Sequence, residues 1–458
     1  MKTIRIGNGA GFWGDSRLAP IEIAREGRLD YLTLEYLAEL TMSILAHLKS
    51  RDPAAGYVSD FPDVVRDLLP VLQEQPGLRI VTNAGGMHPE ACAKRTAEVL
   101  AAGGLGSTIV AAVSGDDLLP AIDAHLAAGE TFAHFETGGP LGDVRSRIVS
   151  ANAYLGAEGI VEALGRGARL VVTGRVADAS LTVGPALHEF GWPGTDWDRL
   201  AVATVAGHLI ECGAQSTGGM YSDWTPAISL GDVGYPIAEI AEDGSCVVTK
   251  PDGSGGAVTV GTVAEQLVYE IGDPAHYLTP DIDADFSHVR LEQEGTDRVR
   301  VAGARGNARP ERYKVSMAYR DGYMAAGTLV IAGRDCANTA RHCAGTVLER
   351  VRRAGLLPER THVEVLGTGD SLPGIPLVPA GEPWEVVLRI AAHDPSREKV
   401  ERVLRELVPL VTSGPPGVTG YAGGRPKPHP VLAYWPTTVA RELARPKVTA
   451  RTAEEWSR

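Results

Sequence analysis

The sequence predicts an α/β fold: an N-terminal, largely parallel, doubly wound sheet followed by a C-terminal α+β domain. Short β-rich runs alternate with helical runs through the first 225 residues, which is typical of parallel strands joined by helical crossovers. Beyond that point strands come in runs and helices follow, as in α+β domains. The 458 residues also exceed what one hydrophobic core usually supports. The predicted domains are residues 1–225 and residues 226–458.

The N-terminal domain is predicted to contain several strand–helix units. The clearest helix covers residues 62–75, where apolar residues recur at helical spacing. Further helices are predicted over residues 91–102, 118–128, 152–166 and 200–212. Strands are predicted at residues 5–6, 31–35, 79–83, 108–113 and 169–173. They are apolar on both sides, as expected where helices cover both faces of a sheet, although a barrel would satisfy the same pattern.

The C-terminal domain is predicted to consist of short strands and three longer helices. The strands are expected at residues 246–249, 289–291, 299–301, 313–317, 326–332, 362–365 and 384–390. The helices are expected over residues 262–269, 337–354 and 396–408. Residues 414–430 read as a rigid Pro/Gly-rich loop, and residues 441–458 are expected to be poorly ordered or to dock on a partner.

The composition excludes several classes of protein. The net charge is −13, whereas a nucleic-acid-binding domain usually carries a basic face. No stretch approaches the roughly 18 apolar residues of a membrane span, and residues 1–13 do not resemble a secretory signal. The five cysteines are odd in number and scattered, which favours reduced thiols. We therefore expect a cytoplasmic protein that binds neither nucleic acid nor membranes.

Glycine and polar residues follow each predicted N-terminal strand. Ligands of open α/β sheets bind outside the carboxyl ends of the strands, so these positions are predicted to contact substrate. The candidates are Asn8, Asp15, Glu35, Asn83, Gly85, Gly86, His88, Asp116, Asp117, Asn152 and Arg175. The alternative is that they serve turns and helix caps, that Asn152 is a simple N-cap, and that Arg175 pairs with Asp178.

A second group of candidates lies at the end of the predicted helix 200–212. His208, Glu211 and Cys212 are spaced so that they can share one helix face. His208 or Glu211 could move protons and Cys212 could act as a nucleophile, with Asp178 as a further catalytic candidate. The polar loop that follows adds Gln215 and Thr217 as substrate-binding candidates. The alternative is a buried helix end with a satisfied histidine.

No cofactor is required by the sequence. Residues 9–14 (GAGFWG) formally match a dinucleotide-binding turn, with Glu35 as a possible ribose ligand, but the carboxylate of Asp15 follows directly. NAD(P) is therefore kept only as an alternative. There is no CxxC or HExxH pattern, and Cys336, His342 and Cys343 on one predicted helix read as core, so no metal site is predicted. GxSxG and Walker A patterns are absent as well.

Several runs along the chain jointly carry a family resemblance. They are GNGAGFWGD (7–15), YLAELTM (36–42), TNAGGMHP (82–89), GDDLL (115–119), NAYLGA (152–157), VTGRVADAS (172–180), HEFGW (188–192), GHLIECGAQSTGG (207–219), GYPIAEI (234–240) and YLTPDI (277–282). Together they resemble the acyclic terpene utilisation (AtuA-type) family, from the N-terminus to about residue 340. The sequence departs from that pattern at Ser216, Thr217 and Met220, which predicts a different substrate preference.

The resemblance implies a cytoplasmic bacterial protein that takes part in the catabolism of branched, terpenoid acyl-CoA compounds. It also implies a small ferredoxin-like domain, which in this family is fused to the chain or encoded beside it. No such unit is visible past residue 410, so a separate small partner chain is expected. A homo-oligomer is expected too.

The predicted function is that of a lyase-type enzyme that acts on a small or branched acyl substrate by acid–base chemistry. Hydration, dehydration or C–C lysis would fit. In this hypothesis Arg175 fixes an anionic group and His208 or Glu211 moves protons, while the amides of residues 85–86 and 218–219 bind phosphate or an enolate oxyanion. The alternatives are an NAD(P)-dependent oxidoreductase and a non-catalytic scaffold or ligand-binding subunit of a small complex.

Overall fold

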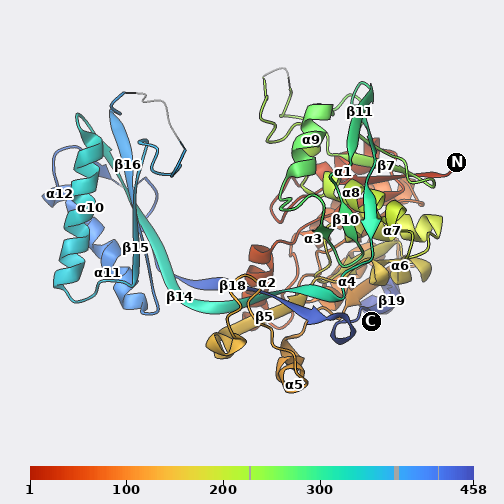
Figure 1. Ribbon diagram of the computed structural model, residues 1–458, viewed down its shortest axis with the longest axis horizontal. Coiled ribbons are helices and arrows are strands. Elements are labelled where there is room, and N and C mark those ends of the chain that lie inside the picture. The colour runs from red at the N-terminus through yellow and green to blue at the C-terminus, as the bar shows by residue number, and fades with distance from the viewer. Residues whose placement is uncertain (226–227, 376–380, 421) are drawn as a thin grey trace. The chain divides into compact units, whose positions relative to one another are not determined.

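The computed structural model of the protein describes residues 1–225, 228–375, 381–420 and 422–458 (Figure 1). The chain divides into two compact units. The large unit comprises Met1–Ala318 and Tyr434–Arg458, and the small unit comprises Tyr319–Ala433. This division differs from the expected boundary near residue 225, which lies within the large unit; residue 226, where the second predicted domain begins, lies outside the described residues.

The large unit is built on a ten-stranded sheet with the strand order β11-β12-β8-β7-β1-β2-β3-β6-β4-β19. The parallel centre consists of β1 (Thr3–Asn8), β2 (Tyr31–Leu34), β3 (Arg79–Thr82), β6 (Leu170–Thr173) and β4 (Ile109–Ser114). Antiparallel strands extend both sides: β7 (Ile237–Ala241), β8 (Cys246–Thr249), β12 (Arg298–Ala302), β11 (Arg290–Gly295) and, beside β4, β19 (Lys447–Thr452). The chain reverses its direction across the sheet between β4 and β6, because β6 returns to lie between β3 and β4.

Helices cover both faces of this sheet, so the predicted α/β class is confirmed. On one face lie α1 (Ala19–Glu26), α3 (Phe61–Glu74), α4 (Pro89–Ala102) and α13 (Ala453–Ser457). On the other lie α6 (Glu158–Gly165), α7 (Ser180–Phe190) and α8 (Trp197–Glu211). The alternation along β4 shows the two sides: Ala112 belongs to the core of the first face, whereas the next residue, Val113, packs against Gly159 of α6.

The remaining elements of the large unit are shorter. The helices are α2 (Glu39–Arg51), α5 (Ile122–Ala127) and α9 (Val260–Val268), and the strands are β5 (Ile148–Ala153), β9 (Tyr277–Leu278), β10 (Asp283–Asp285) and β13 (Arg305–Asn307). The last three form a separate antiparallel sheet in the order β13-β10-β9.

The small unit has its own sheet and its own core. The sheet order is β15-β16-β14-β17, with β15 (Arg360–Leu366), β16 (Glu385–Asp394), β14 (Arg312–Ala332) and β17 (Val418–Gly420). The helices are α10 (Cys336–Arg353), α11 (Arg397–Leu407) and α12 (Leu410–Ser413). Two strands, β14 and β18 (His429–Ala440), have residues in both units, and β18 and β5 also pair with β14.

Three local expectations are wrong. The predicted helix over residues 152–166 is β5 followed by α6, so Asn152 is a strand residue and not an N-cap. The two strands predicted at residues 313–317 and 326–332 are one continuous strand, β14. Residues 441–458 are ordered within the large unit, because β19 pairs with β4 and Trp456 Nε1 donates a hydrogen bond to the Val110 carbonyl oxygen (2.9 Å). The predicted Pro/Gly-rich loop 414–430 contains β17; its residue 421 lies outside the described residues.

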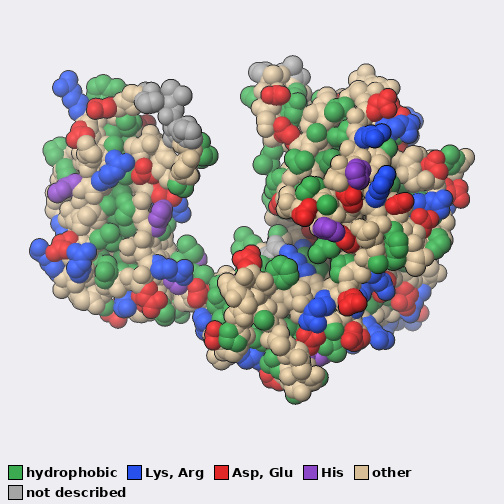
Figure 2. Space-filling view, viewed as in Figure 1, with side chains coloured by type: hydrophobic (Ala, Val, Ile, Leu, Met, Phe, Trp, Pro, Cys, Tyr) green, Lys and Arg blue, Asp and Glu red, His purple; other side chains and the backbone are tan. Residues whose placement is uncertain are grey.

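Two features of the structure bear on nucleic-acid binding and on membrane crossing. Acidic and basic side chains are interspersed over the visible face of each unit (Figure 2). Among the helices of the described residues, none combines the length and the apolar character that a bilayer crossing requires.

Candidate active site

The loops after the parallel strands bring polar side chains into contact, as the sequence predicts. Glu35 follows β2, Asn83 follows β3 and Arg175 follows β6, and these strands are neighbours in the sheet. Asn83 Nδ2 donates a hydrogen bond to Glu35 Oε1 (2.5 Å), and Arg175 Nη1 lies 3.9 Å from the same oxygen. All three side chains are buried.

Glu35 is a buried carboxyl group that favours its protonated form. Its Oε1 also accepts a hydrogen bond from the Leu37 amide (2.8 Å), whereas its Oε2 has no hydrogen-bond partner in the part of the chain that the structure describes. Burial raises the pKa of Glu35 well above its usual value, and the negative charge of Asp178 adds to this effect. The opposing influence of Arg175 and Asn83 is smaller.

Arg175 pairs with Asp178, which is the alternative that the sequence left open. Its Nη1 donates to Asp178 Oδ1 (2.9 Å) and to the carbonyl oxygen of Leu37 (2.9 Å). The guanidinium carbon lies 4.0 Å from the centroid of the Tyr154 ring, a cation–π distance. Arg175 therefore orients Asp178 and the β2–α2 loop.

Asp116, at the end of β4, is a second buried carboxyl group that is held by hydrogen bonds. Its Oδ2 accepts hydrogen bonds from Asn152 Nδ2 (2.7 Å) and from the Arg175 amide (3.0 Å). Burial raises the pKa of Asp116 to about 6. Gly174 leaves room for this carboxylate, since a Cβ there would lie 2.4 Å from Asp116 Oδ1. The neighbouring Asp117 is exposed and accepts a hydrogen bond from the Leu119 amide (3.0 Å), a turn contact.

His208 and Glu211 form a buried pair at the end of α8. His208 Nδ1 lies 3.1 Å from Glu211 Oε1, and His208 Nε2 lies 2.9 Å from the carbonyl oxygen of Gln266. The rings of Tyr277 and Phe286 each lie 5.6 Å from the imidazole, centroid to centroid. His208 is 1% exposed, so it contacts Glu211 and not solvent.

The hydrogen bonds of His208 define its protonation. A carbonyl oxygen can only accept a hydrogen bond, so Nε2 must carry a proton. The contact between Nδ1 and Glu211 needs a second proton, which belongs either to Nδ1 or to the Glu211 carboxyl group. Burial disfavours the charged imidazole, but the hydrogen bond and charge of Glu211 outweigh burial and raise the pKa of His208. Burial also raises the pKa of Glu211 to about 7, against the influence of His208. Glu211 Oε2 has no hydrogen-bond partner among the described residues.

Asp178 links the two groups of acidic side chains. Its side chain is 34% exposed, and its negative charge contributes to raising the pKa of both Glu35 and Glu211. Asp178 therefore lies close enough to both carboxyl groups for its charge to influence each of them. Cys212 lies beside Glu211, and burial followed by the charge of Glu211 raises the pKa of its thiol. The thiolate needed for a nucleophile is therefore disfavoured.

Asn8 and Asp15 hold the loop after β1 in place. Asn8 Nδ2 donates to the carbonyl oxygens of Ala10 (2.9 Å), Ile210 (2.7 Å) and Glu211 (2.9 Å), which fixes the end of α8 against β1. Asp15 Oδ2 accepts from the Gly11 amide (2.8 Å), and its Oδ1 accepts from the Tyr235 hydroxyl (2.6 Å). In a dinucleotide-binding turn the amide of Gly11 would face the diphosphate, so this contact does not favour NAD(P).

Three other predicted substrate contacts have local partners. His88 caps α4, because its Nδ1 accepts from the Ala91 amide (3.4 Å). Gln215 Nε2 donates to Met220 Sδ (3.4 Å) and Thr217 Oγ1 donates to the Ala214 carbonyl oxygen (2.9 Å). The His88 contact is a helix cap, as the alternative for the strand ends expects, and the other two contacts lie within the loop 214–220.

The glycines at the strand ends allow close approach within the protein. A Cβ on Gly85 would lie 2.5 Å from the Thr173 carbonyl oxygen. The Gly86 amide donates to Asn83 (3.1 Å), the Gly218 amide to Gln215 (3.1 Å) and the Gly219 amide to Ala214 (2.9 Å), always to a carbonyl oxygen. These three amides are engaged inside the chain, unlike the free amides of an oxyanion site.

Sequence reasoning missed the residues that enclose His208. Gln266, Tyr277 and Phe286 belong to the part of the chain that was predicted to form a separate domain. The only signal was the run 277–282, which belongs to the family resemblance but bears no obvious catalytic residue.

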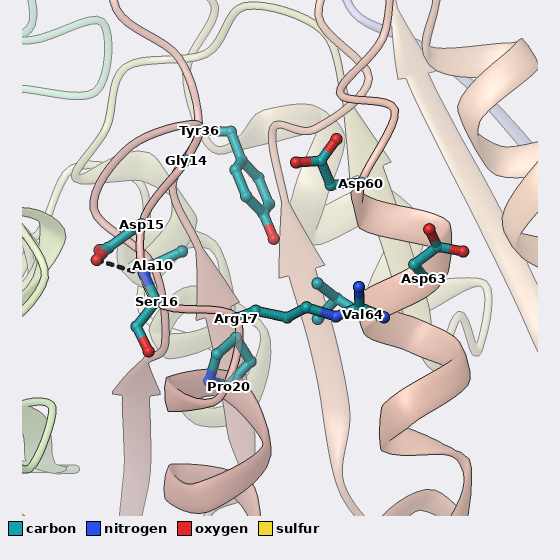
Figure 3. A pocket seen from close by; sticks show the side chains of 10 residues that line it. All are labelled: Ala10, Gly14, Asp15, Ser16, Arg17, Pro20, Tyr36, Asp60, Asp63 and Val64. Carbon is teal, nitrogen blue, oxygen red and sulfur yellow. Dashed lines mark hydrogen bonds between the residues drawn. The ribbon is translucent and has the colours of Figure 1, made fainter. Parts of the chain in front are cut away.

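A cavity of about 120 Å³ opens at the ends of β1 and β2 (Figure 3). Asp15 lines it, together with Tyr36, which directly follows Glu35. Within the described ranges, no three or more His, Cys, Asp or Glu side chains are grouped so that they could hold a metal ion.

A comparison with sequence models of protein families gives a match that covers nearly the whole chain. A sequence model described as "Acyclic terpene utilisation family protein AtuA" matches residues 4–450. The similarity thus continues well beyond residue 340, through the small unit and into β19. No curated protein matches the chain.

Proposed function

Because the chain belongs to the acyclic terpene utilisation family AtuA, we propose that it is an enzyme of this catabolism that acts by proton transfer. The proposed substrate is a small or branched acyl group, carried as a CoA thioester. The reaction class is hydration or dehydration, or a related C–C lysis. The observation that carries this proposal is the buried Glu211 carboxyl group, which has one oxygen 3.1 Å from His208 Nδ1 and a pKa raised to about 7, as suits a general acid or base.

Glu211 is proposed as the group that moves the proton. Its Oε1 is held by His208, and its Oε2 has no hydrogen-bond partner among the described residues. In a dehydration, Glu211 would take a proton from the carbon next to the thioester carbonyl. The electron pair of that C–H bond would form the double bond as the β-hydroxyl leaves, and the hydroxyl would accept a proton to leave as water.

His208, Asp178 and Arg175 are proposed as positioning residues. His208 fixes one Glu211 oxygen and stabilises its ionised form. Arg175 orients Asp178, whose charge contributes to raising the pKa of both Glu35 and Glu211. Glu35, which keeps its proton because it is buried, is the candidate acid that protonates the leaving group.

The test is proton exchange with solvent. The full chain is incubated in D2O with a branched enoyl-CoA thioester and with its hydrated form, and deuterium in the acyl group is measured by mass spectrometry. Wild-type protein should introduce deuterium, and Glu211→Gln should reduce the rate by roughly 10²–10⁴-fold. Glu26→Gln, which removes an exposed carboxylate at the end of α1, should exchange at the wild-type rate. Exchange by Glu211→Gln at the wild-type rate would exclude Glu211 as the acid or base.

We also propose a homo-oligomer and, as the family resemblance implies, a small partner chain. The same exchange assay is run with and without the product of the neighbouring gene, and the mass of the purified assembly is measured. If neither preparation exchanges protons with any of the thioesters, the catalytic proposal fails and a non-catalytic scaffold becomes the better account.

A further inference from the structure

The cavity at the ends of β1 and β2 is a pocket separate from the Glu211 carboxyl group. It is lined by three carboxylates (Asp15, Asp60 and Asp63), by Arg17 and by Tyr36, with small side chains between them (Figure 3). The ring of Tyr36 and its hydroxyl project toward this space from the β2–α2 loop, opposite Asp60 and above Arg17.

Tyr36 is a buried residue whose hydroxyl reaches the cavity. The residue is 5% exposed, and no hydrogen bond of its hydroxyl occurs in the described part of the chain. Its ring is fixed edge-on against Phe61, with the centroids 6.2 Å apart. Burial is the main cause that raises the pKa of Tyr36, so the hydroxyl keeps its proton and acts as a donor. A donor that lines the cavity and is not engaged by a described residue is available to a ligand.

The carboxylates in and around the pocket outnumber the cations, so the pocket carries a net negative charge. Arg17 is already engaged with Asp67, through Nε (2.9 Å) and Nη2 (2.8 Å), and Asp63 is paired with Arg66. The remaining two carboxylates accept hydrogen bonds from neutral donors: Asp60 from the Ser59 hydroxyl (2.9 Å), and Asp15 from two amides and a tyrosine hydroxyl. No Lys, Arg or His among the described residues forms an ion pair with Asp15 or Asp60.

We propose that this pocket binds a small organic cation, an ammonium compound that also carries a hydroxyl group. The carboxylates of Asp60 and Asp15 attract the ammonium group, and the Tyr36 hydroxyl donates to the hydroxyl oxygen of the ligand. The phosphates of a CoA thioester would be repelled by the same charge, so the pocket is distinct from the site proposed for the acyl-CoA substrate. The cavity of about 120 Å³ has room for a ligand of this size.

The experiment is a calorimetric titration of the full chain with ethanolamine at constant ionic strength. A ligand of this size binds with a Kd on the order of millimolar at best, so protein and ligand concentrations are chosen for that range. Ethylene glycol, which has the hydroxyl group without the charge, is the matched neutral probe. Saturable binding of ethanolamine and none of ethylene glycol is expected. No saturable binding, or equal binding of both probes, would overturn the proposal.

Two variants test the named contacts. Asp60→Asn removes one charge at an exposed position that makes no side-chain cap, and it should weaken binding by about 10-fold or more. Tyr36→Phe keeps the ring and should weaken binding of ethanolamine several-fold while leaving binding of ethylamine unchanged. Glu74→Gln, an exposed carboxylate at the far end of α3, should bind like wild type. Circular dichroism verifies that each variant is folded. Unchanged affinity in folded Asp60→Asn would exclude this site.

Discussion

Glu211 and His208 owe their properties to their surroundings more than to their residue types. Asn8 fixes the carbonyl oxygens at the end of α8, and Gln266 holds the far side of the imidazole. The sequence identified the pair from its helical spacing, and it identified Glu35, Asn83 and Arg175 from their places after strands. It could not identify Gln266, because a residue more than fifty positions away along the chain carries no local signal.

Asp116 offers a test of burial at one residue. Its pKa is raised to about 6 from an ordinary value near 4, so the folded protein binds this proton more tightly than the unfolded chain. As the pH rises from about 4 to about 6, the unfolded chain loses the proton first, and this group lowers the free energy of unfolding by up to about 3 kcal/mol.

Asp116→Asn should remove this loss. Denaturant unfolding of wild type and variant at pH 4.5 and pH 7 measures it: the change in free energy of unfolding from pH 4.5 to pH 7 should be more positive in the variant than in wild type, by on the order of 1–3 kcal/mol. An identical pH dependence in both proteins would mean that Asp116 is not perturbed.

At the scale of elements, local sequence predicts some helices and strands and fails for others. The ends of the helices and strands near residues 62–75 and 79–83 follow from local periodicity and turn residues, and the structure confirms these elements. The region 152–166 does not: its polar and small residues suit a helix, but pairing of β5 with β14, far along the chain, makes its first part a strand. Local propensity is overruled where a distant strand supplies the hydrogen bonds.

Gly207 sets the distance between α8 and the loop that carries Arg175 and Asp178. A Cβ at Gly207 would lie 2.8 Å from both the Cα and the carbonyl oxygen of Ala179, and backbone atoms cannot move away cheaply. Gly207→Ala should therefore destabilise the large unit by about 1–3 kcal/mol, an overpacking cost, and displace His208 and Glu211.

Gly165 in α6 is the matched control. A Cβ there meets nothing within 4 Å, so Gly165→Ala should be neutral or stabilising by roughly 0.5–1 kcal/mol. Both are measured by urea unfolding. Equal stability of the two variants would contradict the packing described between α8 and this loop.

At the scale of the whole molecule, the chain leaves the large unit and returns to it. The sequence predicts a domain boundary near residue 225, where alternating strands and helices give way to runs of strands. In the structure, β7, β8, β12 and β11 continue the first sheet beyond that point. The return of residues 434–458, which add β19 beside β4, could not be predicted because the pairing joins segments more than three hundred residues apart. Antiparallel pairing of this kind leaves no trace in composition or periodicity.

The two units have separate cores and should unfold separately. Leu388 lies in the core of the small unit and Ile80 in that of the large unit, both almost fully buried. Leu388→Ala should reduce the free energy of unfolding of the small unit by about 2–5 kcal/mol, which lowers the midpoint of its calorimetric transition and leaves that of the large unit unchanged. Ile80→Ala should lower the midpoint of the large unit only. A single transition that both variants lower would show one cooperative unit.

The pH dependence of proton exchange tests most directly whether Glu211 is the proton-transferring group. With Glu211 acting as the base, the wild-type rate should rise with pH through a titration near 7, an apparent value that belongs to the His208–Glu211 pair. His208 lowers the pKa of Glu211 through its hydrogen bond and charge, so His208→Gln should weaken this effect and move the titration to higher pH while exchange remains measurable. A titration that stays in place, or that moves to lower pH, would contradict the assignment of Glu211 as the base and His208 as its positioning residue.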